Sequence, residues 1–224
     1  MFYFIFFSFI FIFTYQFPYY YNDTEKLCKE KNRKEDIYKP QCLNILLINN
    51  KDRKKFTKMP LFSKITDNLY LGNEIDAKNY DLLTYYNISY IVNAAKKQLV
   101  YYPQKFKYIH LNLSDYSNQD LSKYFYDVLT FMDKAKGNIF VHCHYGKSRS
   151  SSYVIAYLMY KNKWSLKKSY KFVKDKRNYI NPNKGFKEQL KYLDKYFKKE
   201  GYKLKGLKNK NRKKMKKLYS SRDY

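Results

Sequence analysis

The feature that most constrains the fold is a short apolar segment that runs through a polar loop into a long apolar segment. Residues 138–143 (NIFVHC) have the length and the apolar character of a buried strand, and residues 150–162 (SSSYVIAYLMYKN) have those of a buried helix. A buried strand that passes directly into a buried helix is typical of a parallel sheet whose faces are covered by helices. The segment therefore favours an α/β fold.

The same alternation continues on both sides of this segment. Further strands are expected at 63–73 (with a turn), 88–95 and 107–113, and further helices at 77–87, 121–135, 165–179 and 183–200. On the helix at 121–135 we expect one face to carry Tyr124, Val128, Phe131 and Met132, and on the last helix a stripe of Phe186, Leu190, Leu193 and Phe197 to pack on the core. The pattern predicts a mainly parallel central sheet flanked by helices, in a three-layer sandwich.

Length and charge divide the chain into one domain with two extensions. The 224 residues suffice for one domain of about 150 residues, placed at 61–200. A polar linker precedes it at 22–60, and a basic tail, expected to be solvated and disordered, follows at 201–224. The formal net charge of +27 favours anionic partners. Acidic lipid and nucleic acid are alternative partners that the basic tail could contact.

Residues 1–21 form an apolar aromatic leader whose role the sequence leaves open. The run has the length of a signal-peptide core and is shorter than a usual spanning helix. No Lys or Arg precedes it, and no small-residue cleavage site follows it. A signal or membrane anchor and a leader without targeting function are the alternatives. The expected location is cytoplasmic for the catalytic domain, with membrane association or secretory targeting as the alternative.

The three cysteines exclude two classes of site. Cys28, Cys42 and Cys143 form no C-x-x-C pair, which argues against a zinc ribbon and against a disulfide framework. Cys28 and Cys42 lie in the linker, as free thiols or, in an oxidising compartment, as a pair. Cys143 is therefore the cysteine whose neighbouring residues indicate a chemical role.

The loop HCHYGKSRS (142–150) has the features of an anion-binding turn. Backbone N–H groups at the start of a helix favour a phosphate-sized anion, because the unsatisfied donors and the helix dipole both attract negative charge. Gly146 allows a tight turn toward the anion. Arg149 supplies a planar fork for two phosphoryl oxygens, and the positive field favours the thiolate of Cys143. The loop therefore predicts a phosphate site with a cysteine nucleophile.

The two histidines of the loop are not expected to bind a metal. Side chains of adjacent residues do not easily converge on one ion, and the only other histidine is His110. We expect His142 to orient the cysteine through a hydrogen bond, and His144 to act mainly through its backbone N–H. No metal and no organic cofactor is required by this chemistry.

This loop resembles the signature H-C-x-x-G-x-S-R-S of the dual-specificity phosphatases, in the cysteine-based protein tyrosine phosphatase superfamily. ITDNLYLGN (65–73), ISYIVNAA (88–95) and INPNKGFKEQL (180–190) are similar to the opening segment, the first buried strand and a late segment of that family. The resemblance covers about 63–200, in order, and leaves both extensions outside it.

The resemblance implies a phosphocysteine mechanism and assigns roles to residues. Cys143 attacks phosphorus, Asp115 is the general acid, and Ser150 hydrogen-bonds the sulfur. Asp120 is the rival acid, although its position suits a helix start better. Asn183 resembles the support of the signature loop, with a helix N-cap as the alternative. The phosphate-binding residues would be His144, Tyr145, Gly146, Lys147, Ser148 and Arg149.

The substrate implied by the resemblance is phosphotyrosine and phosphoserine or phosphothreonine in proteins. Lys147 adds a cation inside the loop, so phosphoinositides are an alternative substrate class. The high positive net charge makes RNA 5′-phosphates a further alternative. A phosphate-binding module without turnover is the non-enzymatic alternative, although the cysteine, the arginine and an acid are all present. The sequence indicates no oligomeric state.

Overall fold

The computed structural model of the protein describes residues 62–96 and 99–208. The leader at 1–21, the linker at 22–60 with Cys28 and Cys42, and the part of the tail after residue 208 lie outside the described residues. Within the described part, no helix combines the length and the apolar character needed to cross a bilayer.

The described residues form a mixed sheet with β5 at its centre. The strands are β1 (Ser63–Thr66), β2 (Leu69–Gly72), β3 (Ile88–Asn93), β4 (Lys107–His110) and β5 (Asn138–His142). Their order is β1-β2-β5-β3-β4, and every neighbouring pair is parallel except the hairpin of β1 and β2. The expected strand with a turn at 63–73 is therefore this hairpin, and the mainly parallel sheet is confirmed.

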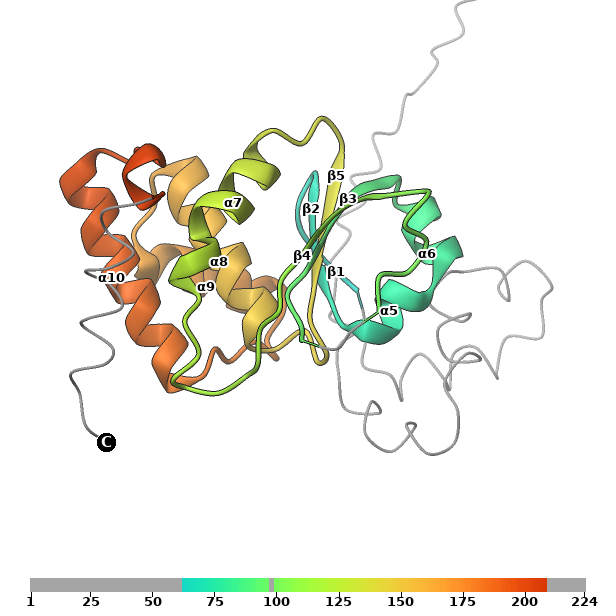
Figure 1. Ribbon diagram of the computed structural model, residues 1–224, viewed down its shortest axis with the longest axis horizontal. Coiled ribbons are helices and arrows are strands. Elements are labelled where there is room, and N and C mark those ends of the chain that lie inside the picture. Colours follow the sequence, from blue (N-terminus) through green and yellow to red (C-terminus); the bar gives the residue numbers. More distant parts are fainter. Residues whose placement is uncertain (1–61, 97–98, 209–224) are drawn as a thin grey trace, which may run out of the picture.

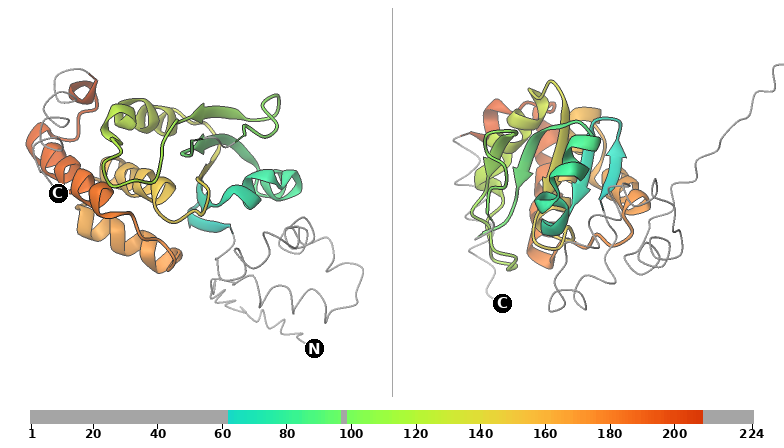
Figure 2. Two further views of the ribbon diagram at one scale, coloured as in Figure 1. Left: turned by 60° about the horizontal axis from the view of Figure 1, so that its bottom comes forward. Right: turned by 90° about the vertical axis from the view of Figure 1, so that its right-hand side faces the viewer.

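Helices cover both faces of the sheet. The short helices α5 (Glu74–Lys78) and α6 (Tyr80–Tyr85) lie on one face, where a single helix was expected. The other face carries the larger helical layer: α7 (Ser122–Asp133), α8 (Arg149–Asn162), α9 (Leu166–Lys176), α10 (Lys184–Glu200) and the 3₁₀ turn η1 (Lys205–Leu207). Figure 2 shows the same three layers from two further sides, which confirms the predicted sandwich.

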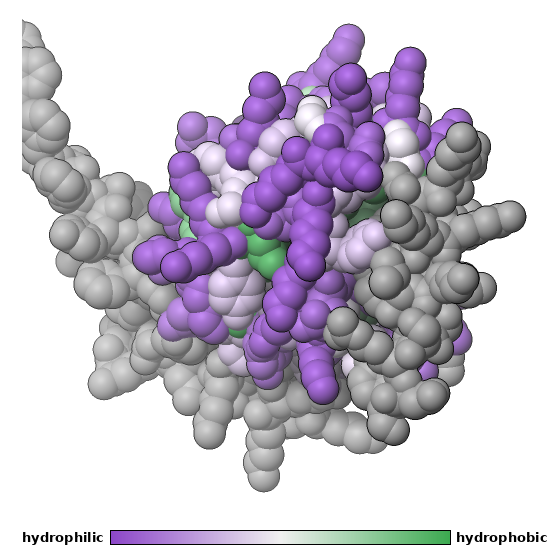
Figure 3. All heavy atoms as spheres, turned by 90° about the vertical axis from the view of Figure 1, so that its left-hand side faces the viewer, coloured by the Kyte–Doolittle hydropathy of each residue, from purple (hydrophilic) through white to green (hydrophobic). Residues whose placement is uncertain are grey.

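The main core lies between the sheet and the larger helical layer. The predicted stripe of α10 (Phe186, Leu190, Leu193 and Phe197) is fully buried in it. On α7 the prediction was partly wrong, because Phe125 and Leu129 are buried with Val128 and Met132, whereas Tyr124 and Phe131 are only partly buried. Phe131 instead packs edge-on against Tyr90 of β3, at 5.7 Å between ring centres. At the α10 end of the molecule the surface is mostly hydrophilic (Figure 3).

The packed domain extends past residue 200, where the basic tail was expected to begin. Gly201 adopts φ 63°, a left-handed conformation that ends α10 and reverses the chain. The ring of Tyr202 then stacks on Phe197 at 5.3 Å, and Leu207 is only 2% exposed. Tyr202, Leu204 and Leu207 therefore pack on the core, because the glycine turns them back onto it, whereas the residues between them are exposed.

Candidate active site

The signature loop lies at the carboxyl end of the central strand. β5 ends at His142, and α8 begins at Arg149, one residue before the apolar segment that predicted a helix. No side-chain cap closes the N-terminus of α8. The positive end of a long helix therefore faces the loop that carries Cys143.

Gly146 makes the turn of this loop possible. Its φ is +64°, which disfavours residues with a Cβ. A Cβ at this position would lie 2.4 Å from the carbonyl oxygen of Gly72 and 2.6 Å from Nη2 of Arg177. The loop therefore presses against β2 and against a buried arginine, and only glycine fits there.

Cys143 is a free thiol, 1% exposed, at the base of the loop. The hydroxyl of Ser150, on the first turn of α8, donates a hydrogen bond to its Sγ at 3.2 Å. This is the contact that the sequence comparison implied for Ser150. A sulfur held at a helix start, beside a hydroxyl donor, is in an environment that stabilises negative charge.

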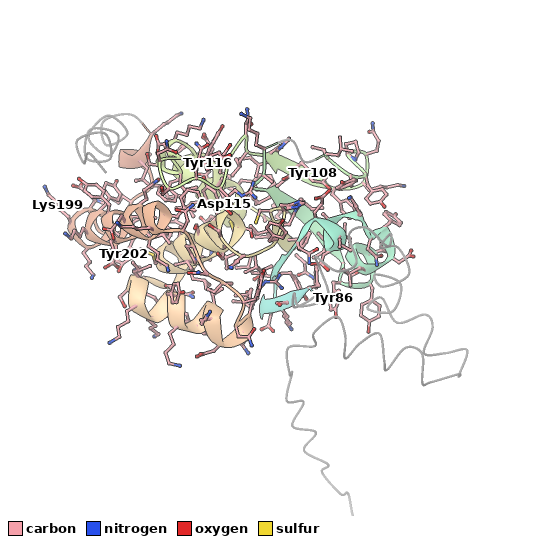
Figure 4. All side chains as sticks on the ribbon, turned by 90° about the horizontal axis from the view of Figure 1, so that it is seen from below. Tyr86, Tyr108, Asp115, Tyr116, Lys199 and Tyr202 are labelled. Atoms are coloured by element: carbon pink, nitrogen blue, oxygen red, sulfur yellow. The ribbon has the colours of Figure 1, made fainter. Side chains whose placement is uncertain are left out.

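Arg149 and Asp115 meet beside the loop. Nη1 of Arg149 donates to the carbonyl of Leu113 at 3.1 Å, and its Nε lies 3.6 Å from Oδ2 of Asp115. That Nε is buried and has no hydrogen-bond partner within the described residues. Figure 4 shows Asp115 between the strands and the helical layer. The buried Nε–H of Arg149, on the first residue of α8, therefore donates no hydrogen bond in the described structure and faces the Asp115 carboxylate at ion-pair distance.

The structure separates the two candidate acids. Oδ1 of Asp115 accepts hydrogen bonds from Ser148 Oγ at 2.6 Å and from Asn183 Nδ2 at 3.0 Å. Asp120 instead accepts hydrogen bonds from the backbone N–H and the hydroxyl of Ser122, at the start of α7. Asp115 therefore lies against the signature loop, and Asp120 stabilises a helix start.

Asn183 combines both of the roles that the sequence left open. Its Oδ1 accepts from the backbone N–H of Phe186 at 3.0 Å, as an N-cap of α10. Its own backbone N–H donates to Ser148 Oγ at 3.1 Å, and its Nδ2 donates to Asp115. One residue therefore joins α10, the signature loop and the segment that carries the acid.

His142 lies in the buried interior behind the loop, and the orienting role expected of it stays a prediction. The ring is fully buried and stacks on Phe140 at 5.4 Å, and neither ring nitrogen has a hydrogen-bond partner within the described residues. Burial lowers the pKa of His142 to about 3, against the opposing effects of the Glu74 charge and the Cys143 backbone. His142 therefore supports the loop by packing, as a neutral ring, because its strand position excludes water.

His144 acts through its side chain, which the sequence did not indicate. Its Nδ1 lies 2.7 Å from Oε2 of Glu74, and the backbone N–H of Glu74 donates to its carbonyl at 3.3 Å. Burial alone would raise the pKa of Glu74, but hydrogen bonds to His144 and Lys78 outweigh it and lower the pKa to about 2. Glu74 thus ties the loop to α5.

Arg177 is the buried support that sequence reasoning missed. It is fully buried at the end of α9, donates from Nε to the carbonyl of Gly146 at 3.0 Å, and donates from Nη1 to Ser63 Oγ at 3.1 Å. Burial lowers its pKa, while the charges of Asp76 and Cys143 oppose the shift. Its only sequence signal was an arginine that ends a helix otherwise rich in lysine.

The remaining loop residues form the rim of the site. The ring of Tyr145 contacts His144 at 4.3 Å and packs with Ile75 and Tyr179, and Lys147 Nζ lies 5.2 Å from the centre of the Tyr179 ring. Across the described residues, no group of three or more His, Cys, Asp or Glu is placed to hold a metal ion.

Comparison with known proteins agrees with this geometry. The family profile described as "Dual specificity phosphatase, catalytic domain" matches residues 69–195. Protein phosphatase Slingshot homolog 1 of Mus musculus is 40% identical over 131 residues, 57% of this chain but only 13% of its own length. Dual specificity protein phosphatase 1 of Arabidopsis thaliana is 38% identical over 136 residues, 59% of this chain and 69% of its own length.

A solved structure shows the same architecture. Human DUSP28 aligns with a TM-score of 0.60 and 25% sequence identity, covering 62% of this chain and 96% of that one. The region matched by the family profile contains the central strand, the signature loop, the acid segment and α10 as far as residue 195. The chain therefore belongs to the dual specificity phosphatase family, whose catalytic domain it carries at residues 69–195.

Proposed function

We propose that the protein is a cysteine-dependent phosphatase that hydrolyses phosphate monoesters on tyrosine and on serine or threonine of protein substrates. The observation that carries this proposal is the start of α8, where Ser150 donates to the Cys143 thiol at 3.2 Å and the buried Nε–H of Arg149 has no hydrogen-bond acceptor within the described residues, with Asp115 at 3.6 Å. A buried, unpaired N–H is costly unless a ligand accepts from it. A phosphoryl oxygen is the matching acceptor.

In the first step, the Cys143 thiolate attacks phosphorus in line with the ester bond. A sulfur–phosphorus bond forms while the bond to the substrate oxygen breaks, and Asp115 gives its proton to that leaving oxygen. The Arg149 guanidinium and the backbone N–H groups of the loop stabilise the charge on the other phosphoryl oxygens. Hydrogen bonds from Ser148 and Asn183 hold Asp115 at the loop.

In the second step, water replaces the cysteine. Asp115, now ionised, takes a proton from the attacking water, the sulfur–phosphorus bond breaks, and inorganic phosphate leaves. The departing thiolate receives the hydrogen bond from Ser150, whose Oγ lies 3.2 Å from the sulfur. Both steps use protein side chains and water.

Protein substrates are supported by the relatives, whose names describe protein phosphatases. Matched phosphotyrosine, phosphothreonine and phosphoserine peptides, an inositol phospholipid in vesicles and a 5′-triphosphorylated RNA should be compared by kcat/KM. Higher values for the peptides would support the proposal. A higher value for the lipid or the RNA would move the substrate assignment to that class.

The reaction itself is tested with an aryl phosphate and the full 224-residue chain. We expect turnover that resists a chelator, is lost by about 10⁴-fold or more in Cys143→Ser, and falls by about 10²–10³-fold in Asp115→Asn. Asp120→Asn is the matched control and should stay within about threefold of the wild type, since the hydrogen bonds of Asp120 go to Ser122 at the start of α7 and not to the signature loop.

Two outcomes would contradict the proposal. Full activity in Cys143→Ser would exclude the cysteine as the nucleophile. A folded wild type that binds phosphopeptides but turns over none of the substrates would indicate a phosphate-binding module instead.

A further inference from the structure

Three lysines lie around the segment 179–181, which is the middle of the connection between α9 and α10. Each residue of the segment holds one of them: the Tyr179 ring lies 5.2 Å from Lys147 Nζ, the Ile180 carbonyl accepts from Lys174 Nζ at 2.9 Å, and Oδ1 of Asn181 accepts from Lys187 Nζ at 2.8 Å. The three lysines come from the signature loop, α9 and α10. Residues distant in the sequence thus bring three ammonium groups to one short segment.

The charges of these lysines are not neutralised. Their contacts are an aromatic face, a carbonyl and an amide oxygen, and none of the three forms an ion pair with a carboxylate in the described ranges 62–96 and 99–208. Three other lysines of the two helices do form such pairs, Lys171–Asp175, Lys191–Glu188 and Lys198–Asp194. The uncompensated positive charge is therefore next to the loop.

The segment is fastened to the signature loop by hydrogen bonds. The backbone N–H of Asn181 donates to the Lys147 carbonyl at 2.8 Å, and Asn183 donates from its backbone to Ser148 Oγ. Just before the segment, Arg177 donates to the Gly146 carbonyl. These hydrogen bonds fix the position of the lysines relative to the signature loop. Their positive charge attracts and orients anionic ligands there.

We propose that Lys147, Lys174 and Lys187 form a cationic collar that binds a second anionic group of the substrate. The inference rests on the proposed function and specifies its substrate: a phosphopeptide with acidic or further phosphorylated residues close to the phosphate that is removed. An extended peptide advances about 3.3 Å per residue, so anionic groups a few positions from the reacting residue come to lie over the collar.

The test uses the full chain and three phosphotyrosine peptides that differ only beside the phosphotyrosine: with neutral flanks, with aspartate flanks, or with a second phosphate. The measured quantity is the ratio of kcat/KM for each anionic peptide to that for the neutral peptide, at low ionic strength. Any general loss of activity in a variant cancels in this ratio. Two screened ion pairs predict a ratio of about threefold to tenfold in the wild type.

Lys174→Gln combined with Lys187→Gln should lower both ratios to below about half of the wild-type values, with Lys147 still present, while Lys195→Gln is the matched control. Lys195 is exposed on the same helix, about 12 Å beyond Lys187 at 1.5 Å per residue, and its variant should keep the wild-type ratios. If the second phosphate raises the ratio and the aspartates do not, the anion is a phosphate. The reverse result assigns carboxylates.

Three results would overturn the collar. They are equal kcat/KM values for all three peptides in the wild type, an equal loss of the ratio in Lys195→Gln, and a lysine dependence seen only with inositol phospholipid vesicles. Hydrolysis of an aryl phosphate by the wild type separates these results from a failure of the proposed function. If that hydrolysis is absent, binding of the same three peptides to the protein tests the collar alone.

Discussion

Two regions of the interior between the sheet and the larger helical layer are stabilised by different interactions: an apolar end near α10 and η1, and a polar end at the start of α8. Toward α10 and η1 the contacts are apolar, as where Phe197 is fully buried against Tyr202. At the start of α8 the buried groups are polar, among them Arg149, Arg177 and Ser150, and directional hydrogen bonds hold them.

This difference separates stability from activity. Apolar burial depends on area and volume and tolerates small shifts, whereas a hydrogen-bonded cradle depends on the position of each donor. Substitutions in the apolar end should therefore mainly change the free energy of unfolding. Substitutions in the polar end should mainly change the rate.

The largest effect is expected from Arg149→Lys. Lysine keeps the charge but loses the planar fork, so we expect kcat/KM for an aryl phosphate to fall by about 10⁴-fold, which corresponds to about 5.5 kcal/mol. The free energy of unfolding, measured by urea denaturation, should change by only about 1 kcal/mol. A variant with nearly full activity would show that the fork is not part of the reaction.

Phe197→Ala should have the opposite profile. Removing this fully buried ring leaves a cavity and should lower the free energy of unfolding by about 4 kcal/mol. Because the ring lies near the far end of α10 and packs against the rings of Tyr160, Tyr196 and Tyr202, kcat of the folded enzyme should stay within about twofold. Phe197→Leu is the milder control. A large loss of kcat in the folded variant would contradict the expectation that the apolar end contributes to stability and not to the rate.

Arg177→Met tests a residue that belongs to both categories. Its hydrogen bonds reach the signature loop and β1, and its charge lies near the buried Asp76. We expect the free energy of unfolding to fall by about 3 kcal/mol, as when a buried charge loses its partner, together with about a tenfold loss of kcat/KM. Arg177→Lys, which retains the charge, should recover more stability than activity. Loss of stability alone would confine Arg177 to the fold.

More of the apolar end than of the polar end could be predicted from the sequence. The stripe of α10 was predictable because helical periodicity is local, and the Cys143 loop because its residues are contiguous. The supports of the loop were not predictable. Glu74 is 70 residues from His144, and Arg177 is 114 residues from Ser63, so neither pair leaves a local pattern.

His142 gives the smallest of the four effects and tests whether the polar end also contributes to stability. Its pKa is lowered to about 3 in the folded protein, whereas an unfolded histidine titrates near 6.5. As the pH falls below 6.5, the unfolded chain takes up a proton that the folded chain does not. The free energy of unfolding should therefore decrease by about 2 kcal/mol between pH 7 and pH 5 because of this residue.

Urea denaturation across this pH range measures the effect in the wild type, in His142→Gln and in His110→Gln. The first variant should lose about 2 kcal/mol of the pH dependence, since a non-titrating side chain takes up no proton in either state. The second is the control, because His110 is exposed at the end of β4 and its charge is the smallest of the four effects on the pKa of His142. Measurements end at pH 5 because Glu74, with a pKa of about 2, adds its own loss of stability at lower pH. Parallel curves for the wild type and His142→Gln would show that the buried ring is protonated in the folded protein, and the polar end would then hold a charge that packing against Phe140 does not explain.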